Sequence, residues 1–313
     1  MKTLYPPIEP HHTFHLEADG HRVYCEESGH TEGLPVLFLH GGPGSGCRPD
    51  HRRFFDPGRF RIILLDQRGA GCSEPSGELR HNDTLKLLED LEALRKTLGI
   101  NRWVLFGGSW GAALSLLYAQ RHPERVLGMI LRGVFLARQY DLDWFIKDGV
   151  RRIYPDRWHE LVTSLPVTGW NDVVQGMYKA VTGSNEALQH RVAMAWNRWG
   201  SAVTLGPDFD PRSQPDLEEI LPKVKIELHY AAHRYFLQEN QILQNCFRIR
   251  AIPCSIVHGR GDLVCPVEAA FTLKRHLPGA ELRILENSGH IATGEEMIDA
   301  LVDATGRMGE RVS

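Results

Sequence analysis

Residues 103–118 read WVLFGGSWGAALSLLY, an apolar run that enters a G-x-S-x-G pentapeptide and continues into a segment rich in alanine and leucine. This order predicts a strand, a tight turn and a helix, the setting in which the pattern forms a nucleophile elbow. The turn presents the side chain of Ser109, while Gly107 and Gly111 allow the strand and the helix to approach closely. A plain helix N-terminus at Ser109 is the competing interpretation, and the preceding strand disfavours it.

A nucleophilic serine needs a base and a carboxylate that orients the base. Residues 256–262 read IVHGRGD, a strand and a glycine-containing loop that ends at Asp262. Residues 282–290 read LRILENSGH, a second strand and loop that end at His290. The chain order Ser109, Asp262, His290 is that of the α/β-hydrolases and differs from the orders in chymotrypsin and subtilisin. We assign a structural role to His258, because it ends the strand that leads to Asp262.

The oxyanion formed during acyl transfer needs backbone N–H donors. Residues 36–46 read VLFLHGGPGSG, an apolar strand that enters a glycine-rich turn. In this fold the donors come from such a loop and from the residue after the nucleophile, so we expect them to be Gly42 and Trp110. A phosphate-binding loop is disfavoured, because the stretch has neither a Gly-Lys-Ser/Thr ending nor the Rossmann spacing.

Taken together, the motifs resemble those of the prolyl aminopeptidases, also called proline iminopeptidases, which are serine peptidases with the α/β-hydrolase fold. The matching stretches are HGGPG at 40–44, DQRGAGCS at 66–73, GGSWG at 107–111, HPERV at 122–126 and LRGVF at 131–135. With the two loops that end at Asp262 and His290, they extend over nearly the whole chain. The resemblance implies removal of an unsubstituted N-terminal residue, typically proline, from a peptide.

The resemblance also implies that lid carboxylates bind the substrate α-ammonium and that aromatic side chains enclose the proline ring. Glu227 matches one such carboxylate, and Phe135 one such aromatic residue. Gly200 stands where a second glutamate is usual, so one carboxylate of the pair is missing. Ile146 and Ala231 stand where a tyrosine and a phenylalanine are usual. An acidic run at 208–219 is interpreted as a solvated loop, although it could replace the missing carboxylate.

Loss of an aromatic ring enlarges a pocket, and loss of a carboxylate weakens ammonium binding. We therefore expect a wider and less ammonium-selective acyl pocket than the resemblance alone implies. The leading hypothesis is a prolyl aminopeptidase-like serine hydrolase. An amidase, esterase or acyltransferase on the same scaffold is the alternative. A non-catalytic binding protein with this fold is a third possibility, which the complete triad and oxyanion loop disfavour.

Composition excludes several classes of function. A net charge of −3 gives no general attraction to nucleic acid or to an anionic membrane. The motifs and the resemblance imply that the partner is a small peptide, amide or ester substrate. The six cysteines form no C-x-x-C pair, and no metal or organic cofactor is needed for the expected chemistry. Neither an 18-residue apolar run nor a signal peptide is found, so a cytoplasmic enzyme is expected.

The alternation of strand and helix patterns predicts a mainly parallel sheet covered on both faces. A helix is expected from Asn82, where leucines recur from Leu85 to Leu98 before Gly99 ends it. Strand patterns become scarce between 136 and 246, where helical spacing and tryptophan dominate. We therefore divide the chain into a hydrolase core at 1–135, a helical cap at 136–246 and the rest of the core at 247–313.

Overall fold

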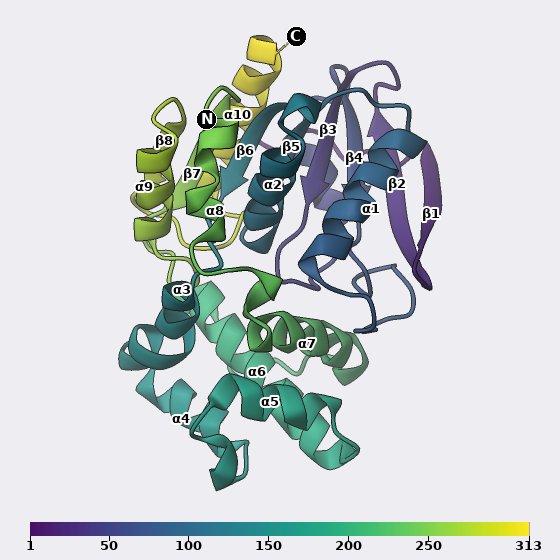
Figure 1. Cartoon of the computed structure of the whole chain (residues 1–313). Helices are drawn as coiled ribbons and strands as arrows, with labels where there is room; N and C mark the ends of the chain where they lie inside the picture. Colours follow the sequence, from purple (N-terminus) through teal and green to yellow (C-terminus); the bar gives the residue numbers. More distant parts are fainter. Residues whose placement is uncertain (313) are drawn as a thin grey trace.

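An eight-stranded sheet forms the centre of the molecule in the computed structural model, which describes residues 1–312 (Figure 1). The strand order is β1-β2-β4-β3-β5-β6-β7-β8. Strand β2 pairs antiparallel with both β1 and β4, and all the other pairs are parallel. The strands are β1 (His12–Ala18), β2 (His21–Gly29), β3 (Leu34–Leu39), β4 (Phe60–Leu65), β5 (Trp103–Gly108), β6 (Val126–Arg132), β7 (Cys254–Gly259) and β8 (Glu281–Leu285). This arrangement confirms the predicted fold class.

Helices cover the sheet on both faces. Helices α1, α2 and α9 bury their apolar side chains in one core with Leu37, Leu105 and Ile256 of the sheet. The alternate side chains of the strands, including Phe38 and Phe106, pack on the other face against α10. These helices are α1 (Thr84–Thr97), α2 (Trp110–Arg121), α9 (Val267–His276) and α10 (Glu295–Val312). Burial of both faces explains why the central strands read as continuous apolar runs.

Helix α1 begins and ends close to the predicted residues. Asp83 caps it by accepting a hydrogen bond from the Lys86 N–H at 2.9 Å, and Gly99 follows its end with a φ of +64°. The predicted leucine stripe is wrong at one position. Leu85 is 47% exposed, whereas Leu87 is buried in the core. The buried face of the helix therefore begins at Leu87 and Leu88 and not at Leu85.

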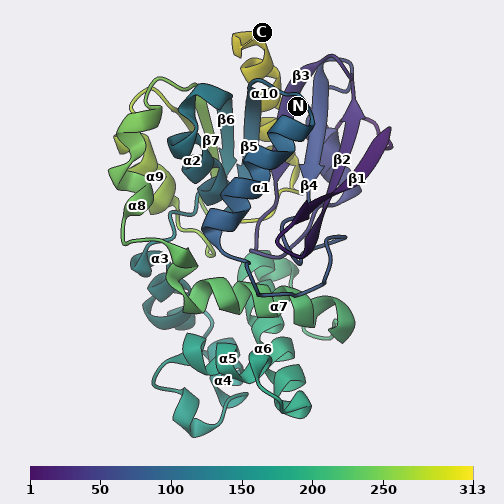
Figure 2. The ribbon, with the colours of Figure 1, turned by 45° about the vertical axis from the view of Figure 1, so that its right-hand side comes forward.

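Between β6 and β7 the chain forms only helices and loops, which lie as a separate layer at one end of the sheet (Figure 2). We call this layer the cap. It comprises α3 (Gln139–Asp143), a π-helical turn (Trp144–Asp148), α4 (Pro155–Thr163), α5 (Val173–Thr182), α6 (Glu186–Leu205) and α7 (Leu217–Ala232), with the short α8 (Gln241–Gln244) leading back to the sheet. The cap has an apolar core of its own, in which Met177, Trp199 and Leu228 are buried. No helix within residues 1–312 is long and apolar enough to cross a membrane.

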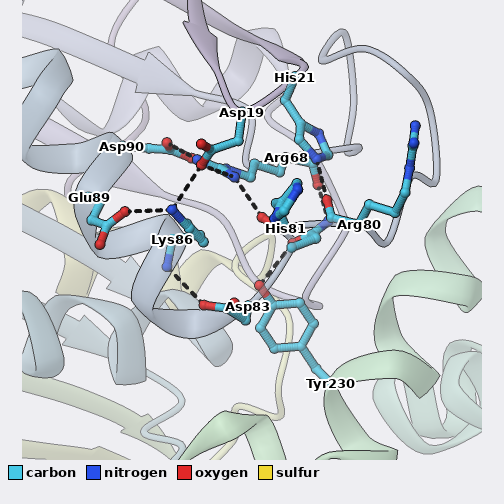
Figure 3. Close-up of polar contacts among 11 residues, drawn as sticks. Asp19, His21, Arg68, Arg80, His81, Asp83, Lys86, Glu89, Asp90 and Tyr230 are labelled. Carbon is cyan, nitrogen blue, oxygen red and sulfur yellow. Dashed lines mark hydrogen bonds and ion pairs between the residues drawn. The ribbon is translucent and has the colours of Figure 1, made fainter.

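A buried ion pair stands where the cap meets the sheet (Figure 3). The Arg68 guanidinium donates to both carboxylate oxygens of Asp90 at 2.6 Å, and both side chains are almost fully buried. Arg68 also donates to the His81 carbonyl at 2.6 Å, and its own carbonyl accepts from the Asn82 amide at 3.0 Å. The Tyr230 hydroxyl of α7 donates to Asn82 at 2.9 Å. The ion pair therefore supports the loop on which α7 rests.

Asp90→Asn is expected to lower the free energy of unfolding by about 3 kcal/mol, because the buried Arg68 guanidinium then loses its buried counter-charge and keeps only the partly exposed Asp19 at 3.1 Å. Urea denaturation followed by circular dichroism measures this loss. Glu89→Gln is the matched control, since Glu89 precedes Asp90 but is 46% exposed and pairs only with Lys86 at the surface. Its effect should be small. If Asp90→Asn is as stable as the control, the ion pair of Arg68 and Asp90 does not contribute substantially to the stability of the fold.

Candidate active site

Ser109 lies in the turn between β5 and α2, the strand, turn and helix that the pentapeptide predicts. Its φ of +57° is unusual for a residue with a side chain and indicates backbone strain. A side chain at Gly107 would overlap the Gly111 carbonyl, and one at Gly111 would overlap the Leu39 carbonyl of β3. The two glycines are therefore required by the close approach of β5, α2 and β3.

Asp262 and His290 are hydrogen-bonded through Oδ2 and Nδ1 at 2.7 Å. The second carboxylate oxygen, Oδ1, accepts from the backbone N–H groups of Val264 at 3.0 Å and Cys265 at 2.8 Å. Burial acts to raise the pKa of Asp262, but the attraction of His290 and these hydrogen bonds outweigh it, so the pKa is lowered. An ionised Asp262 holds the proton of His290 on Nδ1 and leaves Nε2 free to act as a base.

His258 lies close to the same carboxylate but is held by other groups. Its Nδ1 accepts from the Val134 N–H at 3.1 Å, and its Nε2 donates to the Cys265 carbonyl at 2.8 Å. Burial lowers the pKa of His258, which favours the neutral ring. With both nitrogens engaged by backbone, His258 has the structural role expected from the sequence.

A cavity of about 490 Å³ opens between the ends of the central strands and the cap. Ser109 and His290 both line it, so the structure brings the predicted nucleophile and the predicted base to one space. Five of the other predicted site residues also line this cavity: Gly42, Phe135, Gly200, Glu227 and Ala231. None of the five acidic residues of the 208–219 run is among its lining residues within the described chain, and all five are exposed. The run is therefore solvated as expected, although Glu218 and Glu219 lie in the first turn of α7 and not in a loop.

The segments expected to supply the oxyanion donors are linked to each other. Gly42 has a φ of +110°, and the preceding Gly41 packs against Ser109. The Trp110 indole donates to the Gln67 side-chain oxygen at 2.8 Å, and the Gln67 N–H donates to His40 Nε2 at 2.9 Å. Gln67 thus bridges the start of α2 and the glycine loop, which fixes their relative position.

On the cap side, one carboxylate faces the cavity from α7. Glu227 accepts from the Trp196 indole at 2.9 Å and lies 3.6 Å from the Lys223 ammonium, one turn earlier on the helix. Gly200 follows Trp196 by one turn on α6, and a side chain built at Gly200 would meet no atom within 4 Å. Gly200 and Glu227 thus line the same cavity, and the space next to the Gly200 Cα is open.

Ile146 is a correction to the predicted site. It does not line the cavity, because it is 2% exposed and packs in the apolar core of the cap. The π-helical turn at 144–148 directs the preceding residue, Phe145, toward the cavity instead. The Phe145 ring packs edge-on against Trp196 and Trp199, with centroids 6.0 and 5.9 Å apart.

Several lining residues were not predicted as parts of the site. Tyr235 packs edge-on against Phe135 at 4.9 Å, in a run of three residues with positive φ that no glycine marks in the sequence. Cys265 lies 4.0 Å from the Ser109 hydroxyl. Burial raises the pKa of this thiol well above its ordinary value, so it remains protonated. Two arginines, Arg48 and Arg132, are also among the lining residues that were not predicted.

The fold and site define the class of protein. The family model described as the alpha/beta hydrolase fold matches residues 35–296, which places the chain among the α/β-hydrolases. A probable proline iminopeptidase of Leptolyngbya boryana is 43% identical over 98% of this chain and 97% of its own. A proline iminopeptidase of Xylella fastidiosa is 43% identical over 97% of this chain and 99% of its own. A proline iminopeptidase of Arabidopsis thaliana is 40% identical over 98% of this chain and 82% of its own. The chain belongs to the proline iminopeptidase family.

Solved structures agree on the fold. The proline iminopeptidase-related protein from Thermus thermophilus superposes with a TM-score of 0.60 at 19% identity, covering 97% of this chain and 100% of that one. An esterase from Exiguobacterium antarcticum gives a TM-score of 0.60 at 20% identity, covering 95% and 98%. At these identities the likeness extends to the fold alone.

Proposed function

We propose that this chain is a serine aminopeptidase that releases an N-terminal residue, with proline preferred, through an acyl-enzyme on Ser109. The observation that carries the proposal is the hydrogen-bonded pair of Asp262 and His290, whose histidine shares one cavity with the strained Ser109. The relatives named proline iminopeptidase supply the substrate class.

In the proposed reaction, His290 Nε2 takes the proton of the Ser109 hydroxyl as its oxygen attacks the substrate carbonyl. The N–H groups of Gly42 and Trp110 stabilise the resulting oxyanion. His290 then gives its proton to the departing nitrogen as the amide bond breaks. A water molecule, activated by the same histidine, hydrolyses the acyl-enzyme and restores the free serine.

Recognition of the free amine is proposed to rest on Glu227. Its carboxylate faces the cavity from the cap and is 18% exposed, so a substrate ammonium can reach it. Lys223 lies 3.6 Å away and competes for the same charge. Gly200 carries no side chain, and the other carboxylate in the cavity lining, Asp141, is paired with Arg138, so Glu227 is the one carboxylate available to an ammonium where the family resemblance implies two. We therefore propose weaker selection for the free amine than a two-carboxylate site would give.

The test compares kcat/KM for proline, alanine and phenylalanine arylamides, each with a free and an acetylated amine. A preference for free-amine proline supports the proposal. Equal turnover of acetylated substrates would instead favour the amidase, esterase or acyltransferase alternative, for which the open Gly200 position and Ala231 are the supporting observations. In the first outcome Glu227 binds the substrate ammonium, and in the second outcome it has no such role.

Gly200→Glu is expected to raise kcat/KM for the free-amine proline arylamide by about tenfold, because a second carboxylate then faces the substrate ammonium. The first atom of the new side chain meets no neighbour at this position, since nothing lies within 4 Å of a Cβ atom placed there. Gly200→Gln is the matched control, since it adds the same volume and the same helix propensity without the charge. Equal gains in the two variants would attribute the effect to packing, and no gain in either would contradict the assignment of Gly200.

We also propose the cytoplasm as the compartment. All six cysteines are free thiols in the described structure, and three of them, Cys25, Cys246 and Cys254, are buried in the core. Free thiols are typical of a reducing compartment. Fractionation of the native cells, followed by immunoblotting, tests this proposal.

A further inference from the structure

Two arginines line the core wall of the cavity without a carboxylate partner. Arg132 is the last residue of β6, and Arg48 follows the glycine-rich loop after β3. No ion pair to either guanidinium is formed within residues 1–312, whereas the nearby Arg52 pairs with Glu26 at 2.6 Å. Unpaired arginines in a substrate cavity are suited to bind an anionic group, because the guanidinium matches a carboxylate in shape and charge.

Arg132 lies beside the reacting atoms. A side chain built at Gly108, the residue before Ser109, would come within 2.6 Å of its guanidinium. The same guanidinium donates to the backbone carbonyl of His290. Arg132 therefore lies between the nucleophile strand and the histidine that protonates the leaving nitrogen, on the core wall and not on the cap wall that carries Glu227.

Arg48 is exposed at the rim of the same wall. Its backbone N–H donates to His51 Nδ1 at 3.0 Å, and the His51 ring stacks on Phe38 at 4.3 Å. Burial, followed by the positive charges of nearby groups that include Arg48 and Arg132, lowers the pKa of His51 to about 3. His51 is thus neutral and adds no charge to the wall. Both arginines lie near enough to His51 for their charges to lower its pKa.

The nearby carboxylates are already engaged by other groups, including the buried Asp262, whose charge acts on Arg132 but which is hydrogen-bonded to His290. Asp141 also lines the cavity, but it accepts hydrogen bonds from Arg138 on both oxygens. Glu227 is shared between Lys223 and Trp196 on the cap. Next to the arginines, the lining includes the apolar side chains Phe38, Phe54 and Phe106, which stack on one another.

We infer that this wall binds the leaving residue of the substrate through its free α-carboxylate, so that dipeptides with an apolar second residue are the preferred substrates. The inference rests on the proposed function. If the N-terminal residue occupies the cap side of the cavity, the departing residue lies toward the core wall. In a dipeptide, and in no longer peptide, a free carboxylate lies just one carbon atom away from the scissile nitrogen. In a longer peptide or a peptide amide, a neutral amide takes that place.

The test compares kcat/KM for prolyl-phenylalanine and for its C-terminal amide, which differ only in the carboxylate. We expect the acid to be the better substrate by about tenfold in the wild type, the scale of one charge-assisted hydrogen bond. Arg48→Gln should reduce this acid-to-amide ratio to near one. Arg53→Gln is the matched control, because Arg53 lies in the short 3₁₀ helix Pro49–Phe54 that begins directly after Arg48. Arg53 contacts Tyr5 and Asp50 and does not line the cavity, so its variant should keep the ratio.

A ratio near one in the wild type, or an unchanged ratio in Arg48→Gln, would overturn the inference. Proline arylamide is assayed in parallel, because it has no carboxylate and reports on the proposed function alone. If the arylamide is hydrolysed but the acid-to-amide ratio is one, the proposed carboxylate subsite is rejected and the proposed aminopeptidase function is retained. If no free-amine substrate is hydrolysed but acetylated substrates are, both the carboxylate subsite and the aminopeptidase function are rejected.

Discussion

Ser109→Ala is expected to reduce kcat for proline arylamide on the order of 10⁶-fold, because the acyl-enzyme cannot form without the serine oxygen. The fold should be retained, since the hydroxyl makes no hydrogen bond within the sheet and only a long contact with the Cys265 thiol at 4.0 Å. Hydrolysis assays and labelling with a fluorophosphonate probe measure the loss, and thermal unfolding checks the fold. Turnover within tenfold of the wild type would contradict the assignment of the nucleophile.

Ser109→Gly separates the chemistry from the strain. Alanine keeps the Cβ that makes a φ of +57° costly, whereas glycine adopts this conformation freely. Both variants should be inactive, but the glycine variant should be more stable than the alanine variant by about 1 kcal/mol. A glycine variant that is less stable would show that the turn is not strained at Ser109.

The parts of the site that the sequence predicted share a local cause. A nucleophile elbow requires Gly107 and Gly111 within two residues of Ser109, because the strand and helix backbones almost touch there. Asp262 and His290 each follow the end of a strand, and parallel strands bring such ends to one edge of the sheet. Local patterns and a known sheet order were therefore sufficient to place these three residues.

The parts that sequence reasoning missed depend on packing between distant segments. Whether Phe145 or Ile146 faces the cavity is decided by a π-helical turn, which no residue type in that stretch signals. Arg132 ends an apolar strand, where its charge gives no indication of a cavity beyond it. Tyr235 reaches the site through backbone with positive φ that is formed without glycine. Such positions follow from tertiary contacts and not from periodicity.

Asp262→Asn should lower kcat by about 10⁴-fold while leaving the site intact. The direction of the new amide is fixed, because the two N–H groups of Val264 and Cys265 require an oxygen at the Oδ1 position. The amide nitrogen then faces His290 Nδ1, where the carboxylate oxygen stood at 2.7 Å. Two donors cannot bond to each other, so His290 must place its proton on Nε2. In that tautomer it cannot accept the Ser109 proton.

The same substitution makes a pH-dependent prediction about stability. The folded-state pKa of Asp262 is lowered, so its contribution is complete above the unfolded value of about 3.9 and is lost as the pH falls through the folded-state pKa. The difference in unfolding free energy between the wild type and Asp262→Asn should therefore shrink below about pH 4. Urea denaturation across pH 3–7 measures it. Glu286→Gln is the control, since Glu286 is exposed and pairs only with Arg260, away from the cavity lining. Activity of Asp262→Asn within tenfold of the wild type would show that another group orients His290.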